Sequence, residues 1–186
     1  ATGIVGIWIG GLALAEVRFV EPVGRSISVS AVQGNIPQDI KWQSDSVGFI
    51  IREYVDLTST EWGRDLIVWP EAAVPLFRES ALPWLQRWDR QGKATGSALL
   101  LGIPDREPGS DDFWNAAIVL GDGDGRYIKR RLVPFGEYVP LEGLLRGTIA
   151  FFDLPMANNQ PGPWEQAPLR AGDLSLSLSI CYEVVY

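Results

Sequence analysis

Three short apolar runs constrain the fold of this chain more than any other feature of its sequence. They read DLIVWP, SALLLGIPD and FWNAAIVL, and proline, glycine or aspartate bounds each of them. Apolar runs of about four to eight residues between such breakers are typical of buried strands. The first run must end at Pro70, because proline has no N–H to donate to a sheet. We therefore expect a buried sheet in the domain.

The segments around these runs predict a mixed α/β domain. DSVGFIIREYVDLTSTEW has helical spacing, and ALPWLQRWDRQGKATG is a second helical segment, which glycine closes. The predicted apolar face of the first helix consists of Ile50, Ile51, Tyr54, Val55 and Leu57. SISVSAVQG alternates like a strand, GDGDGR favours a hairpin turn into YIKRRLVPF, and LSLSLSIC is a final strand with one apolar face. Strands that alternate with helices, together with hairpins, indicate a mixed α/β fold.

The charge balance and the missing histidine exclude several classes of function. A net charge of −7 and a longest basic cluster of only Lys129–Arg131 argue against nucleic acid as a partner. Without histidine the chain has no Ser-His-Asp or Cys-His arrangement and no histidine metal site. Its one cysteine cannot form an internal disulfide. Catalysis in this chain must therefore use carboxylate, lysine, tyrosine or thiol groups.

The first fifteen residues, ATGIVGIWIGGLALA, carry no charged side chain. As a helix they span about 22 Å, at about 1.5 Å per residue, whereas a bilayer core is about 30 Å thick. The stretch has no basic region and is therefore a poor signal peptide. Two interpretations stay open from these residues alone: a buried helix or strand, or the tail of a transmembrane helix whose beginning is missing.

Three residues at predicted strand ends are candidates for catalysis. Glu71 follows the first buried run, Lys129 lies in the strand after the Asp-Gly turn, and Cys181 ends the final strand. Each also has a plain structural interpretation: a solvated acid, a solvent-facing lysine and a small buried hydrophobe, respectively. Strand alternation weakens the last of these, because it places Cys181 on the serine side of LSLSLSIC.

Together the three side chains make chemical sense as an acyl-transfer site. A carboxylate can take the proton of a thiol when no histidine is available. A lysine beside the reacting carbon stabilises the oxyanion, helped by the backbone N–H that follows the nucleophile. We expect Glu71 to be partly buried beside Lys129, and the reaction to proceed through a thioester on Cys181. A large separation between the side chains of Glu71 and Lys129 would count heavily against this mechanism.

Five stretches carry a resemblance to a known family: VQGNIPQDIKW, LIVWPEAAVP, YIKRRLVPFGEYVPLEGLL, FFDLPM and SICYEVVY. They resemble the nitrilase, or carbon–nitrogen hydrolase, superfamily, whose triad is Glu, Lys and Cys in that chain order. Within it they are most similar to the apolipoprotein N-acyltransferases. The resemblance implies an α/β fold: a nitrilase-like αββα sandwich domain over residues 26–186, incomplete at its C-terminal side. Residues 1–20 would be the end of a transmembrane helix and a linker, so that the chain is a fragment.

The same resemblance implies roles for individual residues. Glu71 would be the general base, Lys129 the oxyanion-stabilising residue and Cys181 the nucleophile. Glu137 matches a second glutamate, which would hold Lys129 and help proton transfer. Positions that the family needs for activity are matched by Trp42, Tyr182 and Glu183. The structural alternatives for these three are a packing tryptophan, a core tyrosine and a surface acid. The resemblance implies no metal and no other cofactor.

The implied reaction moves a fatty acyl chain from a phospholipid, typically phosphatidylethanolamine, to the N-terminal amine of a diacylglyceryl-cysteine on a bacterial lipoprotein. The expected partners are this phospholipid acyl donor, the diacylglyceryl lipoprotein acceptor and the membrane. The protein would be a monomer in the bacterial inner (cytoplasmic) membrane, with its catalytic domain on the periplasmic side. The apolar segment 141–156 would line an acyl-chain entrance, and the fragment by itself would be inactive.

Two other functions stay open at this point. A soluble nitrilase-type amidase would hydrolyse a small amide and would need neither a transmembrane segment nor an apolar lid. A non-catalytic scaffold would keep the fold without the reaction. The intact set of Glu71, Lys129, Glu137 and Cys181 argues against the scaffold.

Overall fold

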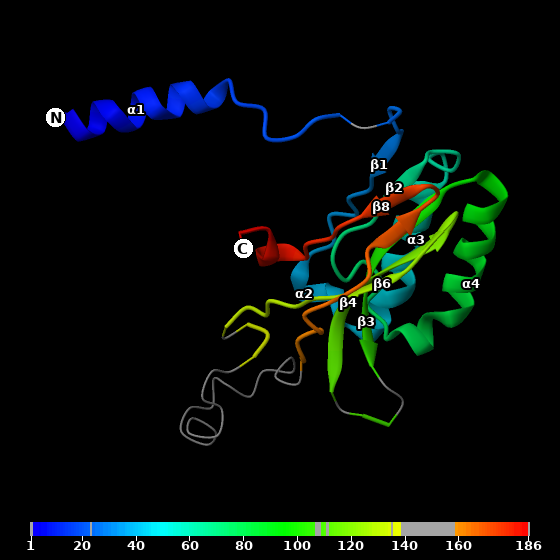
Figure 1. Cartoon of the computed structure of the whole chain (residues 1–186). Helices are drawn as coiled ribbons and strands as arrows, with labels where there is room; N and C mark the ends of the chain where they lie inside the picture. Colours follow the sequence, from blue (N-terminus) through cyan, green and yellow to red (C-terminus); the bar gives the residue numbers. More distant parts are fainter. Residues whose placement is uncertain are drawn as a thin grey trace, which may run out of the picture.

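Two sheets and one layer of helices make up the domain (Figure 1). The structure is a computed structural model that describes residues 2–22, 24–106, 109–110, 112–134, 136–138 and 159–185. The larger sheet has the order β1 (Val29–Ala31), β2 (Leu66–Val68), β3 (Ala98–Arg106), β4 (Phe113–Gly121) and β6 (Arg126–Ile128). The smaller sheet has the order β5 (Gly123–Asp124), β7 (Leu169–Ala171) and β8 (Leu174–Leu176). The predicted segment 141–156 lies outside the described residues.

Strand direction in the larger sheet brings several strand ends to one edge. β1, β2 and β3 are parallel, β4 is antiparallel to β3, and β6 is antiparallel to β4. β6 therefore runs in the same direction as β1–β3. The residues that follow β2 and β6 consequently leave the sheet at the same edge, where the first residues of β4 also lie.

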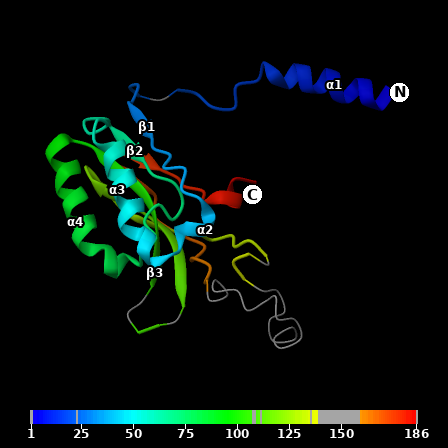
Figure 2. The same cartoon turned by 180° about the vertical axis from the view of Figure 1, so that it is seen from behind.

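Helices α3 (Val47–Thr58) and α4 (Arg78–Thr95) cover one face of the larger sheet (Figure 2). Both helical segments were predicted, and α4 ends as expected at glycine: Gly96 has φ +67° and caps the helix. The predicted face of α3 is wrong at Leu57, which is 41% exposed. Thr58 is buried instead, and its hydroxyl accepts a hydrogen bond from Trp69 Nε1 at 2.8 Å. The buried side of α3 is centred on Ile51, Tyr54 and Thr58, which leaves Leu57 at its rim.

The apolar run of β3 is continuous because both faces of this strand are buried. Leu99, Leu101 and Ile103 pack under the helices, whereas Leu100 packs toward the smaller sheet. Both faces of a central strand are thus covered by apolar side chains. The second cluster contains Leu66, Ala98, Leu100, Ala117, Val119, Leu169, Ala171 and Ile180. Helices, larger sheet and smaller sheet form three successive layers, which agrees with the predicted mixed α/β sandwich as far as the described residues extend.

The final strand is shorter than predicted, but its alternation continues beyond it. β8 covers only Leu174–Leu176 and pairs with β7. Leu178 is half-buried and Ile180 is buried, while Ser177 and Ser179 are exposed. Cys181 follows on the exposed side, as the alternation predicted, and begins the 3₁₀-helix Cys181–Val185.

Helix α1 (Thr2–Ala15) lies away from both sheets (Figures 1 and 2). Residues 3–15 are exposed, including Ile7 and Trp8, so the alternative of a buried helix or strand is wrong. In the part of the chain that the structure describes, no helix has both the length and the apolar character that crossing a bilayer requires.

Candidate active site

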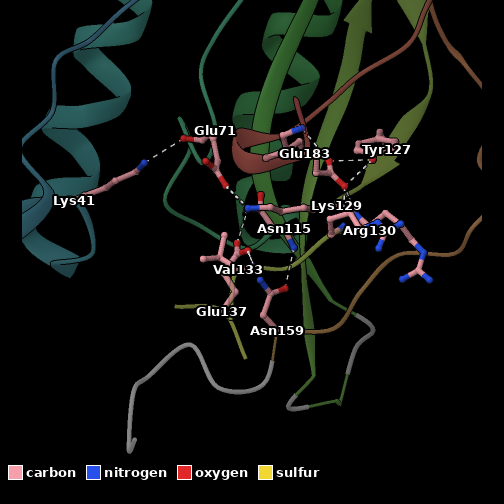
Figure 3. Close-up of polar contacts among 12 residues, drawn as sticks. Lys41, Glu71, Asn115, Tyr127, Lys129, Arg130, Val133, Glu137, Asn159 and Glu183 are labelled. Atoms are coloured by element: carbon pink, nitrogen blue, oxygen red, sulfur yellow. Dashed lines mark hydrogen bonds and ion pairs between the residues drawn. The ribbon is translucent and has the colours of Figure 1, made fainter. Parts of the chain in front are cut away.

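A charged cluster around the buried Lys129 lies at the carboxyl edge of the larger sheet (Figure 3). Glu71 follows β2, Lys129 follows β6, and Asn115 lies near the start of β4. The backbone N–H of Lys129 donates to the carbonyl of Asn115 at 2.8 Å and so extends the β4–β6 pairing by one residue. The strand directions described above therefore place these three residues side by side.

A close backbone contact fixes the turn that carries Glu71. The turn crosses directly over β3 at Gly102, whose N–H donates to the carbonyl of Pro70 at 3.3 Å. A Cβ on Gly102 would lie 2.5 Å from the nitrogen of Ala72 and 2.7 Å from the Cα of Glu71. Only glycine allows this approach, and Ala72 itself has φ +46°. The glycine of SALLLGIPD thus sets the position of Glu71.

Lys129 is the most deeply buried charge of the cluster, at 1% exposure. Its Nζ donates to Glu137 Oε1 at 2.8 Å and to Glu71 Oε1 at 3.3 Å. Burial alone lowers the pKa of Lys129, but the hydrogen bond to Glu137 and the charges of Glu71, Glu137 and Cys181 outweigh it and raise this pKa. Lys129 is therefore held as an ammonium between two carboxylates, and the expected position of Glu71, partly buried beside it, is confirmed.

Asn115 completes the cluster and was missed in the sequence. Its Nδ2 donates to Glu71 Oε1, and also to Glu137 Oε1 at 3.3 Å. The amide therefore lies between two groups of like charge and gives each a hydrogen bond. Asn115 is the one polar residue in the apolar run FWNAAIVL. A polar side chain in such a strand needs a hydrogen-bond partner, and this requirement could have marked Asn115 as a candidate site residue.

Glu137 is anchored on its other oxygen. Oε2 accepts the backbone N–H of Val133 at 2.8 Å, and the N–H of Glu137 donates to the carbonyl of Val133 at 2.9 Å. This local turn after β6 aims the carboxylate back at Lys129. The contact between Glu137 and Lys129 that the resemblance implied is present.

Cys181 lies in the segment after β8 and borders the same cavity as Glu71. It is exposed, and its φ of +55° lies in the left-handed region that non-glycine residues seldom adopt. It lines a cavity of about 180 Å³ together with Glu71. The remaining lining is mainly apolar and includes Val68, Leu100, Ala117, Leu178 and Ile180. The cavity brings the thiol to the Glu71 side of the buried cluster.

Glu183 connects the cysteine segment to the segment after Lys129. Oε1 accepts the backbone N–H of Arg130 at 2.6 Å and that of Arg131 at 2.8 Å, and Oε2 accepts the N–H of Ile180 at 2.9 Å. The hydroxyl of Tyr127 donates to the same carboxylate at 3.0 Å. Glu183 is only 8% exposed, so the alternative of a surface acid is wrong. Burial, with the hydrogen bond and charge of Glu183, raises the pKa of Tyr127 to about 12.

The two aromatic candidates lie at the surface. Tyr182 is 62% exposed, so the alternative of a core tyrosine is wrong. Trp42 is 49% exposed and lines a second cavity, of about 210 Å³, which also borders Glu71 and Glu137. Trp42 is therefore a cavity wall rather than a packed core residue.

Lys41, the neighbour of Trp42, was not singled out from the sequence. It ends the short helix α2 (Gln38–Lys41) and its Nζ donates to the backbone carbonyl of Glu71 at 3.1 Å (Figure 3). Burial lowers the pKa of Lys41, and the charge of Glu71 opposes this effect. No alternation or spacing in QDIKW marks this lysine, because its contact is 30 residues away in the chain.

Lys129 thus lies buried between two glutamates, and Cys181 lines a cavity together with one of them, Glu71. Residues 28–186 match the family model described as Carbon-nitrogen hydrolase, and the chain belongs to this family. Curated relatives named "Apolipoprotein N-acyltransferase" include one from Pseudomonas syringae pv. tomato, 46% identical over 96% of this chain. Another, from Coxiella burnetii, is 36% identical over 96% of this chain. The predicted resemblance is confirmed.

The matched region is a part of those relatives. This chain spans 36% of the length of the Pseudomonas syringae protein and 37% of that of the Coxiella burnetii protein. Among solved structures, the Caenorhabditis elegans NitFhit protein matches 86% of this chain and 38% of its own, with a TM-score of 0.53 and 14% identity. This likeness supports the nitrilase-like fold alone.

Proposed function

We propose that this chain carries the Glu–Lys–Cys site of an apolipoprotein N-acyltransferase. The observation that carries the proposal is the cluster in which Lys129 lies buried against Glu71 and Glu137, while Cys181 shares a cavity with Glu71. The name of the curated relatives, at up to 46% identity, supports an acyltransferase over the amidase alternative. The likeness to the NitFhit structure bears on the fold alone and does not favour the amidase.

In the first half-reaction, Glu71 takes the proton of the Cys181 thiol. The thiolate attacks the ester carbonyl carbon of the phospholipid, and Lys129 stabilises the oxyanion that forms. The carbon–oxygen ester bond then breaks, Glu71 returns the proton to the leaving alkoxide, and a lysophospholipid departs. Oε1 of Glu71 accepts from Lys129 and Asn115, so Oε2 is the oxygen that carries the proton.

In the second half-reaction, the α-amine of the diacylglyceryl-cysteine attacks the thioester carbonyl. Glu71 takes a proton from the amine, Lys129 again stabilises the oxyanion, and the carbon–sulfur bond breaks. The proton on Glu71 returns to the sulfur of Cys181 and regenerates the site. Water would hydrolyse the thioester, and the lining of the cavity beside Cys181 is mainly apolar.

The supporting residues have separate tasks in this proposal. Glu137 and Asn115 hold Lys129 and Glu71 in place. Glu183 fixes the backbone on either side of the site, and Trp42 forms a wall of the second cavity. Tyr182, next to the nucleophile, is exposed where an acceptor approaches.

Membrane attachment is part of the proposal. The exposed apolar surface of α1 supports its assignment as the end of a membrane helix, with residues 1–20 as helix and linker and residues 26–186 as catalytic domain. The partners are then a phospholipid and a diacylglyceryl lipoprotein, and the location is the bacterial inner membrane with the site on the periplasmic side. We propose a monomer that is active only at the full length of the relatives.

Intact mass tests the proposal in a protein of the relatives' full length that contains this chain. Incubation with phospholipid in detergent should add one fatty-acyl mass that hydroxylamine removes, and Cys181→Ala should lack it. A well-folded protein that gains no acyl mass but hydrolyses small amides would overturn the acyltransferase in favour of the amidase. Full function of Cys181→Ala would instead favour the scaffold.

A further inference from the structure

A second cavity borders the proposed catalytic cluster, and Cys181 is not among the described residues that line it. It has a volume of about 210 Å³ and shares Glu71 with the cysteine cavity. Its wall includes Lys41, the last residue of α2, and Trp42, which follows it. Asn159, the first residue of the described range 159–185, also lines this cavity. The proposed reaction, as written above, uses neither Lys41 nor Asn159.

The cavity wall holds a buried hydrogen-bond donor without a partner. Asn159 is 3% exposed, and its Oδ1 accepts the backbone N–H of Asn115 at 3.3 Å, which fixes the orientation of the amide. Its Nδ2 then has no hydrogen-bond partner among the described residues. A buried N–H without a partner costs free energy, so such a group in a cavity wall points to a ligand acceptor.

Lys41 adds a cation to the same wall. Its Nζ donates to the backbone carbonyl of Glu71 and lies 5.7 Å from the centre of the Trp42 ring, and the described residues supply it with no salt-bridge partner. An ammonium has three donors, so Lys41 retains donors for a ligand. Unlike Lys129, Lys41 forms no salt bridge with a carboxylate of the described residues.

Three of the four carboxylate oxygens of Glu71 and Glu137 already accept hydrogen bonds from this chain. Glu71 Oε1 and Glu137 Oε1 accept from Lys129 and Asn115, and Glu137 Oε2 accepts from Val133. Glu71 Oε2 has no hydrogen-bond donor among the described residues and is the oxygen that carries the proton in the proposed reaction. The donors with spare capacity in the cavity wall are the ammonium of Lys41 and the amide N–H of Asn159. Donors of this kind, beside an aromatic wall, suit an oxyanion.

We propose that the cavity formed by Lys41, Trp42 and Asn159 binds a phosphate-type oxyanion, and that in the catalytic cycle this oxyanion is the phosphodiester of the acyl donor. This assignment rests on the proposed function. Because Glu71 borders both cavities, a phospholipid whose phosphate occupies the second cavity places its ester groups toward Cys181. Lys41 and Asn159 thus orient the donor, and a diacylglycerol lacks the group that they hold.

Phosphate binding is tested first, in a protein that cannot form the thioester. In the full-length Cys181→Ala protein, inorganic phosphate and glycerol 3-phosphate are titrated and followed by ³¹P NMR. Lys41→Met, which keeps the apolar stem, should weaken binding about tenfold or more, the effect of losing a charge-assisted hydrogen bond. Asn159→Ala should weaken it less, and Lys93→Met, an exposed lysine on α4, should not change it. Equal binding by Lys41→Met and the parent overturns the site.

Donor choice is tested second, in single-turnover thioester formation. Phosphatidylethanolamine and a diacylglycerol with the same acyl chains are compared in mixed micelles. The unsubstituted protein should prefer the phospholipid about tenfold or more. Lys41→Met should slow the phospholipid reaction about tenfold more than the diacylglycerol reaction and so lose this preference, and Lys41→Arg should restore it. Equal slowing with both donors would mean that Lys41 only holds the Glu71 backbone, and would overturn the assignment.

The two experiments separate the possible failures. Phosphate binding that depends on Lys41, with an unchanged donor preference in Lys41→Met, would indicate a site for free phosphate and overturn the lipid assignment. Thioester formation from neither donor would refute the proposed function, while the titration of Cys181→Ala would still decide whether the oxyanion site exists.

Discussion

The two sides of the candidate active site are held in place by different means. The lysine side, which consists of Glu71, Asn115, Lys129 and Glu137, is a mutually bonded cluster on strand ends of the larger sheet. The cysteine side, residues 180–183, is a short segment after β8 with an exposed thiol and a positive φ at Cys181. Its main anchor is one carboxylate, that of Glu183.

The charged groups of the lysine side are therefore rigidly held, whereas the nucleophile on the cysteine side is accessible. Charges that stabilise an oxyanion work best when they are fixed before the reaction, because no reorganisation is then needed. A nucleophile that must meet two large substrates in turn needs an open side. The comparison predicts large losses of stability for changes on the lysine side and local effects for changes on the cysteine side.

Removal of the Lys129 ammonium should strongly destabilise the lysine side. Lys129→Met leaves the carboxylates of Glu71 and Glu137 next to each other without a positive charge. Breaking a buried pair in this way costs about 3–5 kcal/mol. Thermal or denaturant unfolding of the full-length protein should show this loss together with loss of thioester formation, whereas Lys93→Met should stay within about 0.5 kcal/mol. A loss below about 1 kcal/mol would mean that the carboxylates are solvated, contrary to a rigid lysine side.

A smaller perturbation should displace Glu71 alone. Gly102→Ala places a methyl group 2.5 Å from the nitrogen of Ala72, so the turn that carries Glu71 must shift. We expect a loss of about 1–3 kcal/mol, typical of overpacking, and a slower thioester reaction. Gly48→Ala is the matched control, because nothing lies within 4 Å of the added carbon and the position is helical. An unchanged rate in Gly102→Ala would show that the position of Glu71 tolerates movement.

The sequence predicted features that depend on local periodicity. Strands β1–β4, β6 and β8, both helical segments and the exposed side of Cys181 follow from apolar runs, alternation or helical spacing within one segment, whereas β5 and β7 were not predicted. Asn115 and Lys41 were missed because their partners lie 44 and 30 residues away, at a strand edge that only the sheet topology defines. Leu57 was wrongly placed on the buried face of α3, because the burial of a residue at the edge of that face depends on the elements packed against it. Thr58 is buried instead, and its hydroxyl has a hydrogen-bond partner in Trp69.

The smallest effect concerns the anchor of the cysteine side, and Tyr127 reports it. The pKa of Tyr127 is raised to about 12 by burial and by its hydrogen bond to Glu183. A folded-state pKa above the unfolded value near 10 contributes stability that is complete below pH 10 and is lost as the pH rises toward 12. Tyrosinate absorbance after a rapid pH jump should show a transition near pH 12 that Tyr127→Phe removes.

Glu183→Gln should move this transition toward lower pH, because the glutamine carries no charge that opposes the tyrosinate. The same variant should slow thioester formation while the Lys129–Glu137 contact and most of the stability persist, since the two sides have separate anchors. Tyr182→Phe, at the exposed position beside the nucleophile, should leave the Tyr127 transition in place. If Glu183→Gln destabilised the protein as much as Lys129→Met, the two sides would form one cooperative unit, and the division between fixed charges and an accessible nucleophile would not hold.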